Sequence, residues 1–538
     1  RTLHHGEVSL LDLASFEGGA KSRIARLRLG EQHHAGHVTV KAVQKPPVAI
    51  GSERSKHVAA QREGAVQQRV TKMTLAGLRG HTRGLGNAQR LVALEQHVWR
   101  KVSIRHRPLA LRCILAVLGW AWWHGGSIAA VGGACRGSIP AMPITTHGTA
   151  ARLARFGESV FTRISRLATE HQAVNLGQGF PNFDGPAFVK DAGKAAIDAG
   201  FGQYARMYGM PDVNAAIARR VKLDQSIDVD PEREITITSG CTEAIAATML
   251  GLVEPGDEVV LIEPFYDSYP ATVAMAGGVL KTVRLQAPDF RLPVEALRAA
   301  VTDRTRLILL NTPHNPTGRV FDAQELQAVA DIATSAGCLV VSDEVYEHLW
   351  YGQPHRSIAT LPGMRERTIV LSSLGKSFSL TGWKIGWAIA PPHLTAGIRA
   401  AHQFLTFCSA TPLQHATIAA LQAPPSYFDA LRAEYAERRT AMVEVLRQAG
   451  FDPMVPEGSY FVLADHTRFG HASDEAFCEH LIRQVGVAAI PCSAFYADPA
   501  GGRALVRFAF CKTLETIAEA GSRMKARLHP LAGSRGSC

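Results

Sequence analysis

The sequence predicts an α/β protein in which a large domain with a mainly parallel β-sheet precedes a smaller α/β domain. The first observation is that, from about Arg152 onward, short and continuously apolar runs alternate with segments of helical period. Strands that are apolar at every position are buried on both faces, which is typical of parallel sheets covered by helices. The second observation is a long charged helical segment after Pro424 and Pro425, which leads into another α/β pattern ending near Leu528.

The individual elements follow from these patterns in chain order. Strands are predicted at residues 234–239, 258–263, 306–311, 338–343 and 368–373. Helices are predicted at residues 242–253, 294–301, 323–336 and 429–449. We expect an N-terminal segment packed on the small domain (142–185), a large domain (186–428), a small domain (429–528) and a tail (529–538). Ligands of such sheets bind at the carboxyl ends of the strands, where the motifs described below fall.

Residues 1–141 differ from the remainder in composition. They contain 21 Lys and Arg against 7 Asp and Glu, a single Phe (Phe16), no Tyr, and ten of the 22 His. No sustained helical or strand period is visible, so we predict a non-domain extension upstream of Met142, with a separate binding module as the alternative. This stretch carries a net charge of 21 − 7 = +14, so it accounts for all of the chain's formal charge of +11. The remainder, with 37 Lys and Arg against 40 Asp and Glu, indicates neither a nucleic acid nor a membrane partner.

The cysteines and apolar runs limit the kinds of site and location. Nine cysteines are scattered without a C-x-x-C pair or a His cluster at zinc-ligand spacing, so neither a disulfide framework nor a metal site is expected. We therefore predict a cytoplasmic protein. The strongest apolar run, Cys113 to Trp123, is far shorter than the roughly 20 residues that a membrane-spanning helix needs.

The segment SSLGKSFSLTGWKIGW (372–387) places Lys376 just beyond a predicted apolar strand. A lysine that forms an imine needs a fixed, partly desolvated position, because an ammonium in water is protonated and inert. We expect Lys376 to project at the carboxyl end of the strand. Ser373 and Lys384 are candidates to hold a phosphate from two sides.

Two further strand ends carry polar groups that suit a pyridine ring. Asp343, in SDEVYEH, would be costly to bury without a cationic partner, and a protonated pyridine nitrogen is such a partner. Tyr346 is then placed to donate to the ring oxygen beside the imine, and Asn315, in NTPHNPTG, can offer its amide to the same oxygen. In isolation, an Asp at a strand end is more often a helix cap or part of a structural ion pair.

Three more motifs complete the predicted site. Gly240 in TSGCTEA lets the backbone approach closely, and the amides of Cys241 and Thr242 at a helix start form an anion site for phosphate. Tyr266 in EPFYDSY is a candidate to stack on the ring, although a core aromatic is an equal alternative. Arg507 in RFAFCK offers a guanidinium that matches a substrate carboxylate.

Taken together, residues from about Arg152 to Leu528 resemble a class I aminotransferase of fold type I. The segments that carry the resemblance, in the family's order, are LGQGFPNFDGP (176–186), QYARMYGMPDV (203–213), NPTG (315–318), DEVY (343–346) and SLGKSFSLTGWKIGW (373–387). The similarity is nearest to the methionine and kynurenine–glutamine aminotransferases. It implies pyridoxal 5′-phosphate bound to Lys376 and a mainly parallel seven-stranded sheet in the large domain.

The resemblance also implies a homodimer whose active sites lie at the subunit interface. Tyr204 of one chain would reach the phosphate held by the other, and the Gly179 backbone would contact the substrate carboxylate opposite Arg507. Phe180 and Phe407 would shape the side-chain pocket. Tyr266 replaces the phenylalanine or tryptophan of some relatives, which preserves stacking, whereas Cys408 beside the pocket leaves the side-chain preference open.

The predicted activity is transfer of an amino group from an L-amino acid to a 2-oxo acid with ping-pong kinetics, Lys376 acting as the base. The expected donors are methionine, aromatic amino acids, glutamine or kynurenine. A cysteine-conjugate β-lyase is one alternative, since the same scaffold supports elimination. The other is a transcription regulator with a basic DNA-binding region at residues 1–141, although no helix-turn-helix pattern is visible there.

Overall fold

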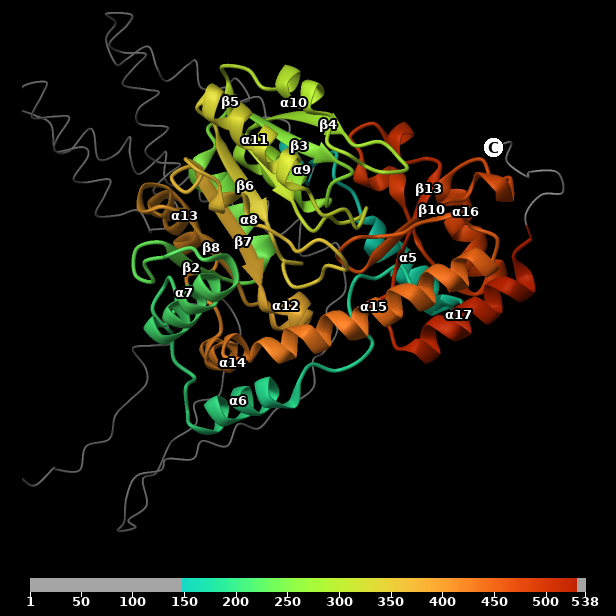
Figure 1. The fold of residues 1–538 in the computed structure, drawn as a ribbon, viewed down its shortest axis with the longest axis horizontal. Coiled ribbons are helices and arrows are strands. Elements are labelled where there is room, and N and C mark those ends of the chain that lie inside the picture. Colours follow the sequence, from blue (N-terminus) through green and yellow to red (C-terminus); the bar gives the residue numbers. More distant parts are fainter. Residues whose placement is uncertain (1–147, 530–538) are drawn as a thin grey trace, which may run out of the picture. The chain divides into compact units, whose positions relative to one another are not determined.

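The computed structural model describes residues 148–529 (Figure 1). The predictions for residues 1–141 and for most of the C-terminal tail therefore lie outside the described residues. Within residues 148–529, no helix combines the length and the apolar character needed to cross a bilayer. The cytoplasmic location stays a prediction.

The large part of the fold is built on a seven-stranded sheet. Its order is β2-β8-β7-β6-β5-β3-β4, and β8 alone runs antiparallel to its two neighbours. The strands are β2 (Ile235–Thr238), β3 (Glu258–Glu263), β4 (Val279–Arg284), β5 (Thr305–Asn311), β6 (Leu339–Asp343), β7 (Thr368–Ser373) and β8 (Gly386–Ile389). The predicted mainly parallel sheet is confirmed, and the five predicted strands are present within one residue at either end.

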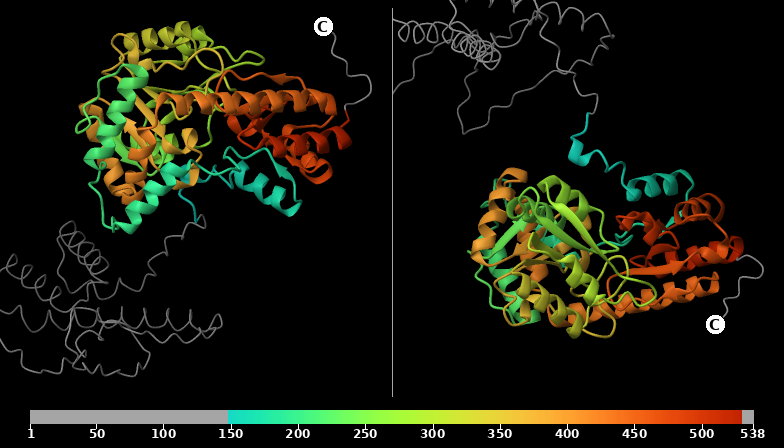
Figure 2. Two further views of the ribbon diagram at one scale, coloured as in Figure 1. Left: turned by 60° about the horizontal axis from the view of Figure 1, so that its bottom comes forward. Right: turned by 90° about the horizontal axis from the view of Figure 1, so that it is seen from above.

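Both faces of this sheet are buried, as its apolar strands require. Successive side chains point to opposite faces, so Val259, Leu307 and Val341 join one core cluster. Val260 and Val340 join the other cluster. Helices α8 (Cys241–Leu252), α9 (Ser268–Ala276) and α13 (Pro392–Leu405) supply the first cluster, whereas α7 (Pro211–Gln225) and α11 (Ala323–Ala336) contribute to the second (Figures 1 and 2).

Three predicted helices lie in this part, and their observed bounds are within one residue of the predicted ones; the other helices of this part were not predicted. Helix α11 starts with a capping box between Asp322 and Glu325 and ends at Gly337, whose φ of 67° suits a residue without Cβ. The helices are α6 (Ala187–Asp198), α7 (Pro211–Gln225), α8 (Cys241–Leu252), α9 (Ser268–Ala276), α10 (Val294–Ala300), α11 (Ala323–Ala336), α12 (Leu374–Ser377), α13 (Pro392–Leu405) and α14 (Thr411–Leu421).

A second sheet of four antiparallel strands forms the smaller part. Its order is β12-β13-β10-β9. The strands are β9 (Pro453–Met454), β10 (Phe461–Asp465), β12 (Ile490–Pro491) and β13 (Leu505–Ala509). Strand β1 (Val174–Asn175) pairs in parallel with β11 (Val487–Ala488), which joins the N-terminal segment to the smaller part. Its helices are α5 (Val160–Glu170), α16 (Asp474–His480) and α17 (Leu514–Arg527).

One long helix, α15 (Pro425–Gln448), runs from beside the large sheet to the small sheet (Figure 1). It begins four residues before the predicted helix because Pro425 fits the first helical turn, where an amide proton has no partner. The predicted domain boundary between residues 428 and 429 falls inside this helix. The division into domains stays a prediction.

Candidate active site

A cavity of about 430 Å³ opens at the carboxyl ends of β5, β6 and β7. Eleven of the fourteen predicted site residues line it. They are Gly179, Cys241, Thr242, Tyr266, Asn315, Asp343, Tyr346, Ser373, Lys376, Lys384 and Arg507. The fold thus brings together residues that are up to 328 positions apart in the sequence.

Asp343 is the last residue of β6, and its carboxylate is buried and oriented by neighbours. The Tyr269 hydroxyl donates to Oδ2 at 2.7 Å, and the Cys241 thiol lies 3.6 Å from Oδ1. The Val345 amide donates to Oδ1 at 3.3 Å. Burial raises the pKa of Asp343, while these donors favour the ionised form. A cationic ring nitrogen is a partner that would offset the burial.

Lys376 lies on the short helix α12, immediately after β7. Its Nζ donates to the Tyr460 hydroxyl at 3.0 Å, and no other hydrogen bond to this amine is present among the described residues. Burial lowers the pKa of Lys376 because desolvation disfavours the ammonium form. A neutral amine at this position can act as a nucleophile or a base near neutral pH.

The start of α8 forms a cradle for an anion. Gly240 has φ 79°, and no side chain caps the helix, so the first backbone amides are free of a side-chain acceptor. A Cβ on Gly240 would lie 3.1 Å from Lys384 Nζ, which shows how closely this ammonium approaches the helix start. Ser373 and Thr242 line the same cavity as Lys384. A phosphate group suits this combination of helix dipole, hydroxyl and cation.

Arg507 comes from β13 and is only 1% exposed. Its guanidinium donates to Asn315 Oδ1 at 2.8 Å and to the Gly177 carbonyl at 2.9 Å, and it lies 4.1 Å from the centroid of the Phe461 ring. The Nε atom is buried without a hydrogen-bond partner among the described residues. A buried donor without an acceptor at a cavity wall is suited to an incoming carboxylate.

Gly179 and Tyr346 are held by the packing of aromatic rings. A Cβ on Gly179 would lie 2.8 Å from Phe461 Cζ, so a larger residue would displace this ring. The Tyr346 ring packs edge-on against Tyr460, with centroids 5.1 Å apart, and burial raises the pKa of its phenol. Both residues are therefore fixed in the cavity wall.

Three predicted residues do not line the cavity in the single chain. Tyr204 is 83% exposed, Phe180 47% and Phe407 45%. The rings of Tyr204 and Phe407 meet edge to face at 5.4 Å. The Phe180 carbonyl accepts from Lys512 Nζ at 2.7 Å. Their predicted roles require a second subunit or a bound substrate.

Sequence reasoning missed three residues of this region. Asp267 lines the cavity, Tyr269 donates to Asp343, and Tyr460 accepts from Lys376. Asp267 and Tyr269 lie in the EPFYDSY motif, so their nearness to Tyr266 was an available signal. Tyr460 is 84 positions from Lys376, and no local pattern marks it.

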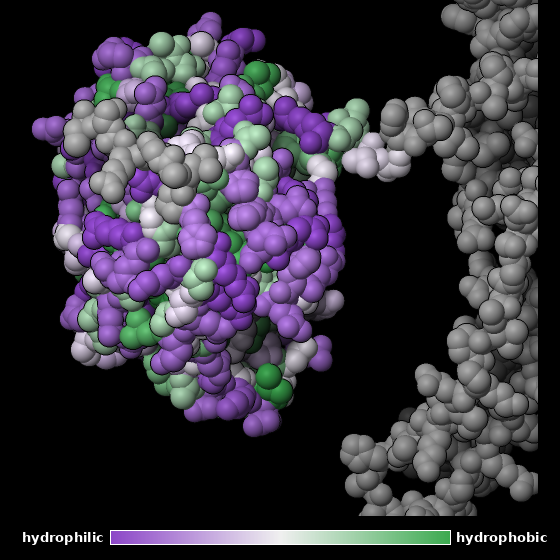
Figure 3. All heavy atoms as spheres, turned by 90° about the vertical axis from the view of Figure 1, so that its right-hand side faces the viewer, coloured by the Kyte–Doolittle hydropathy of each residue, from purple (hydrophilic) through white to green (hydrophobic). Residues whose placement is uncertain are grey.

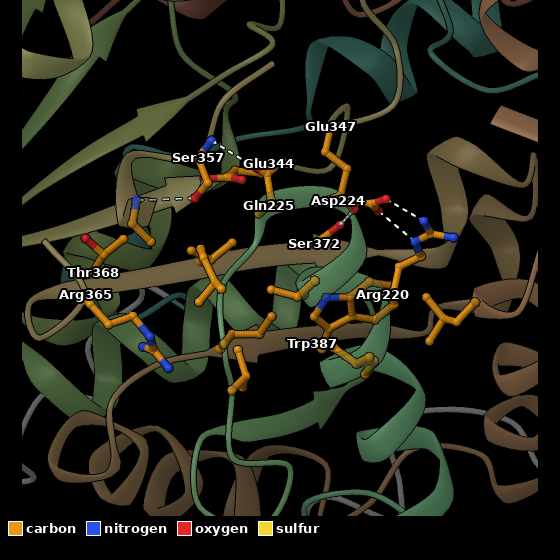
Figure 4. Close-up of a pocket in the computed structure, with 18 residues that line it drawn as sticks. Arg220, Asp224, Gln225, Glu344, Glu347, Ser357, Arg365, Thr368, Ser372 and Trp387 are labelled. Atoms are coloured by element: carbon orange, nitrogen blue, oxygen red, sulfur yellow. Dashed lines mark hydrogen bonds and ion pairs between the residues drawn. The ribbon is translucent and has the colours of Figure 1, made fainter. Parts of the chain in front are cut away.

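A second, much smaller cavity lies between α7 and the strands β7 and β8 (Figure 4). Its volume of about 30 Å³ holds roughly one water molecule. Glu347 lines it, one residue after Tyr346, and accepts from the Ser372 hydroxyl at 2.8 Å. Ser372 in turn directly precedes Ser373. This hydrogen bond links the segment after β6 to the end of β7. The small cavity has no room for a substrate.

Burial raises the pKa of Glu347 from 4.5 to about 8, which makes stability depend on pH. Between about pH 4.5 and pH 8 the unfolded chain has lost this proton and the folded chain keeps it, so stability falls as pH rises. Glu347→Gln stays neutral and can still accept from Ser372. Its free energy of unfolding relative to the wild type should therefore increase by about 1–3 kcal/mol between pH 5 and pH 8. Chemical denaturation at both pH values measures this difference, and an equal effect at both would contradict it.

Comparisons with known proteins agree with this arrangement. Residues 171–524 match the sequence profile of the family described as aminotransferase class I and II. A probable N-succinyldiaminopimelate aminotransferase of Mycobacterium tuberculosis is 47% identical over 389 residues, which cover 70% of this chain and 98% of that protein. A methionine aminotransferase of Escherichia coli is 39% identical over 375 residues, covering 70% of this chain and 97% of that protein.

Solved structures give the same result for the fold. The structure of N-succinyldiaminopimelate aminotransferase from Mycobacterium tuberculosis matches with a TM-score of 0.68 and covers 70% of this chain and 99% of that one. A methionine aminotransferase structure from Escherichia coli also matches with a TM-score of 0.68, at 39% identity and with coverage of 70% and 99%.

Proposed function

The chain belongs to the class I and II aminotransferase family and depends on pyridoxal phosphate, and we propose that it moves the amino group of an L-amino acid to a 2-oxo acid by a ping-pong mechanism. The observation that carries the proposal is that one cavity collects a buried lysine, a buried carboxylate and a buried arginine with a free donor. The lysine suits the aldehyde of the cofactor, and the carboxylate suits its ring nitrogen. The arginine suits the carboxylate of a substrate.

The residues of the cavity fit the cofactor group by group. The amides of Cys241 and Thr242, with Ser373 and Lys384, would hold the phosphate. Asp343 would hold the proton on the ring nitrogen, Asn315 and Tyr346 would bond the ring oxygen, and Tyr266 would stack on the ring. When bound, pyridoxal phosphate supplies an electron-withdrawing ring that stabilises negative charge at the substrate α-carbon.

Lys376 would serve first as the attachment point of the cofactor and then as the base. Its depressed pKa keeps a fraction of the amine neutral, and only the neutral amine can accept the proton of the substrate α-carbon. Asp343 assists from the opposite edge by keeping a positive charge on the ring. The water-excluding walls around both residues strengthen these interactions.

Arg507 would bind the substrate carboxylate. We expect Arg507→Ala to weaken substrate binding by about 2–5 kcal/mol, mainly as a raised KM, since truncating one half of a buried charge pair has this effect. Arg507→Lys is the matched control, because it retains the charge but not the planar fork, and it should lie between the alanine variant and the wild type. Steady-state kinetics with one amino acid donor measure both, and an unchanged kcat/KM in Arg507→Ala would exclude this role.

The proposed donors have long apolar side chains: methionine or an aromatic amino acid, with glutamine and kynurenine as further candidates. The exposed aromatic rings of Phe180 and Phe407, which the family resemblance assigns to the side-chain pocket, support this choice. The 47% identical relative is named for N-succinyldiaminopimelate, so this donor is the second candidate. A screen that follows the absorbance of the bound cofactor with each donor separates the candidates. Release of pyruvate and ammonia from a cysteine conjugate, without amino transfer, would instead favour the β-lyase alternative.

The proposed assembly is a homodimer. Five exposed hydrophobic side chains lie in the 201–204 segment, at the end of α13 and just beyond that helix: Phe201, Tyr204, Phe404, Leu405 and Phe407. Phe404 and Tyr204 are more than four-fifths exposed, which is unusual for large apolar or aromatic groups on a free surface. The side that carries α16 and α17 is, in contrast, mostly hydrophilic (Figure 3). Sedimentation equilibrium tests the dimer.

A further inference from the structure

Tyr460 connects the lysine of the cavity to the segment that would bind the substrate carboxylate. It precedes β10 directly and is fully buried. Its hydroxyl accepts from Lys376 Nζ at 3.0 Å and donates to the Gly179 carbonyl at 2.5 Å. Tyr460 does not line the cavity itself, so it would act on the reaction through Lys376.

The directions of these two bonds follow from the number of protons. A phenol has one hydroxyl proton and two lone pairs. A backbone carbonyl can only accept, so the proton of Tyr460 is committed to Gly179. The oxygen of Tyr460 therefore has only lone pairs left for Lys376, and it can accept an N–H but cannot donate to the amine.

This restriction has a consequence for a neutral lysine. The amine has two N–H groups and one lone pair, and a donor beside it would occupy that lone pair. Because Tyr460 accepts an N–H instead, the lone pair stays available for a proton from the substrate. The same contact stabilises any form of the nitrogen that carries a proton, since the bond is stronger to a charged donor.

We propose that Tyr460 is a positioning residue for Lys376. Its hydroxyl oxygen orients the amine by accepting a hydrogen bond from it. The Gly179 carbonyl sets the direction of that bond, because it takes the hydroxyl proton. This inference rests on the proposed function, in which Lys376 is the base. It adds a residue outside the cavity wall to the groups on which the reaction depends.

The other ionisable groups near Lys376 do not provide this bond. Asp343 and Arg507 act on the amine through their charge. The Tyr346 ring centroid lies 5.5 Å from Nζ. Among the described residues, Tyr460 alone is hydrogen-bonded to Nζ.

The test uses the full-length holoenzyme with Tyr460→Phe, which keeps the ring and removes the hydroxyl. The first readout is the pH titration of the visible absorbance of the bound cofactor without substrate. Its midpoint should fall by about one pH unit, a tenfold change in the protonation equilibrium, because the acceptor for the protonated nitrogen is lost. The second readout is the separate effect on kcat and on KM. The kcat should fall by about 10-fold to 100-fold with little change in KM.

Tyr435→Phe is the matched control. Tyr435 is buried in the same aromatic cluster, with its ring stacked 6.0 Å from that of Tyr460. Its hydroxyl makes no hydrogen bond with any part of the chain that the structure describes. We expect this variant to keep the wild-type midpoint and kcat.

The outcomes separate this inference from the proposed function. Suppose that Tyr460→Phe keeps the wild-type midpoint while the wild-type protein transfers amino groups. This result would overturn the role of Tyr460 and leave the proposed function intact. Equal shifts in both tyrosine variants would also overturn it, since they would report loosened packing. A wild-type protein without amino transfer would overturn the proposed function itself.

Discussion

Lys376→Ala protein is expected to lose both the covalently bound cofactor and its turnover, by more than about 10⁴-fold. The reason is that two functions of one amine disappear together: the attachment of pyridoxal phosphate and the removal of the α-proton, which alone contributes about 10²–10⁴-fold. The visible absorbance of the purified protein and the rate of amino transfer measure the two losses separately.

Lys384→Ala is the control for the identity of this lysine. Lys384 lines the same cavity, but its ammonium lies at the start of α8, where it would bind phosphate. This variant should still attach the cofactor covalently while binding it more weakly. Ordinary turnover by Lys376→Ala, or loss of covalent attachment in Lys384→Ala alone, would refute the assignment of Lys376.

The second large effect is expected for Asp343→Asn, with kcat reduced by about 10³-fold. An amide cannot hold a proton on the ring nitrogen, so the electron-withdrawing power of the ring falls in the transition state. The structure should be preserved, because the amide oxygen can still accept from Tyr269, which donates to Oδ2 at 2.7 Å. Stopped-flow absorbance of the first half-reaction measures the effect.

A cofactor analogue makes the Asp343 prediction specific. Reconstitution of Asp343→Asn with pyridoxal phosphate methylated at the ring nitrogen provides a positive charge that no longer depends on a carboxylate. Part of the lost rate should return with this analogue. A kcat within tenfold of the wild type in Asp343→Asn, or no recovery with the analogue, would show that charge on the ring nitrogen is not the role of Asp343.

The sequence predicted much of the fold because continuous apolar strands leave a strong local signal. The strand at residues 258–263 was predicted with its observed bounds, and so was the strand at 368–373. Strands β4 and β8 of the large sheet were not predicted. Strand β4 is an edge strand whose residues are mostly not buried, and β8 has only four residues directly after the Lys376 motif, so neither shows a long apolar run.

The site was predictable to the extent that its residues follow strands. Asn315, Asp343 and Lys376 come after β5, at the end of β6 and after β7, and parallel strands bring their carboxyl ends to one edge. Tyr269 and Tyr460 were missed for a different reason. Their importance depends on hydrogen bonds to partners 74 and 84 positions away, which leave no periodic pattern in the sequence.

Covalent binding of the cofactor by Lys376 is the premise of the proposed mechanism. Reduction of the holoenzyme with borohydride, followed by proteolysis and mass spectrometry of the peptides, tests it most directly. We expect one pyridoxyl group per chain, on the peptide that contains Lys376. A label on Lys384, on Lys512 or on no lysine at all would contradict it.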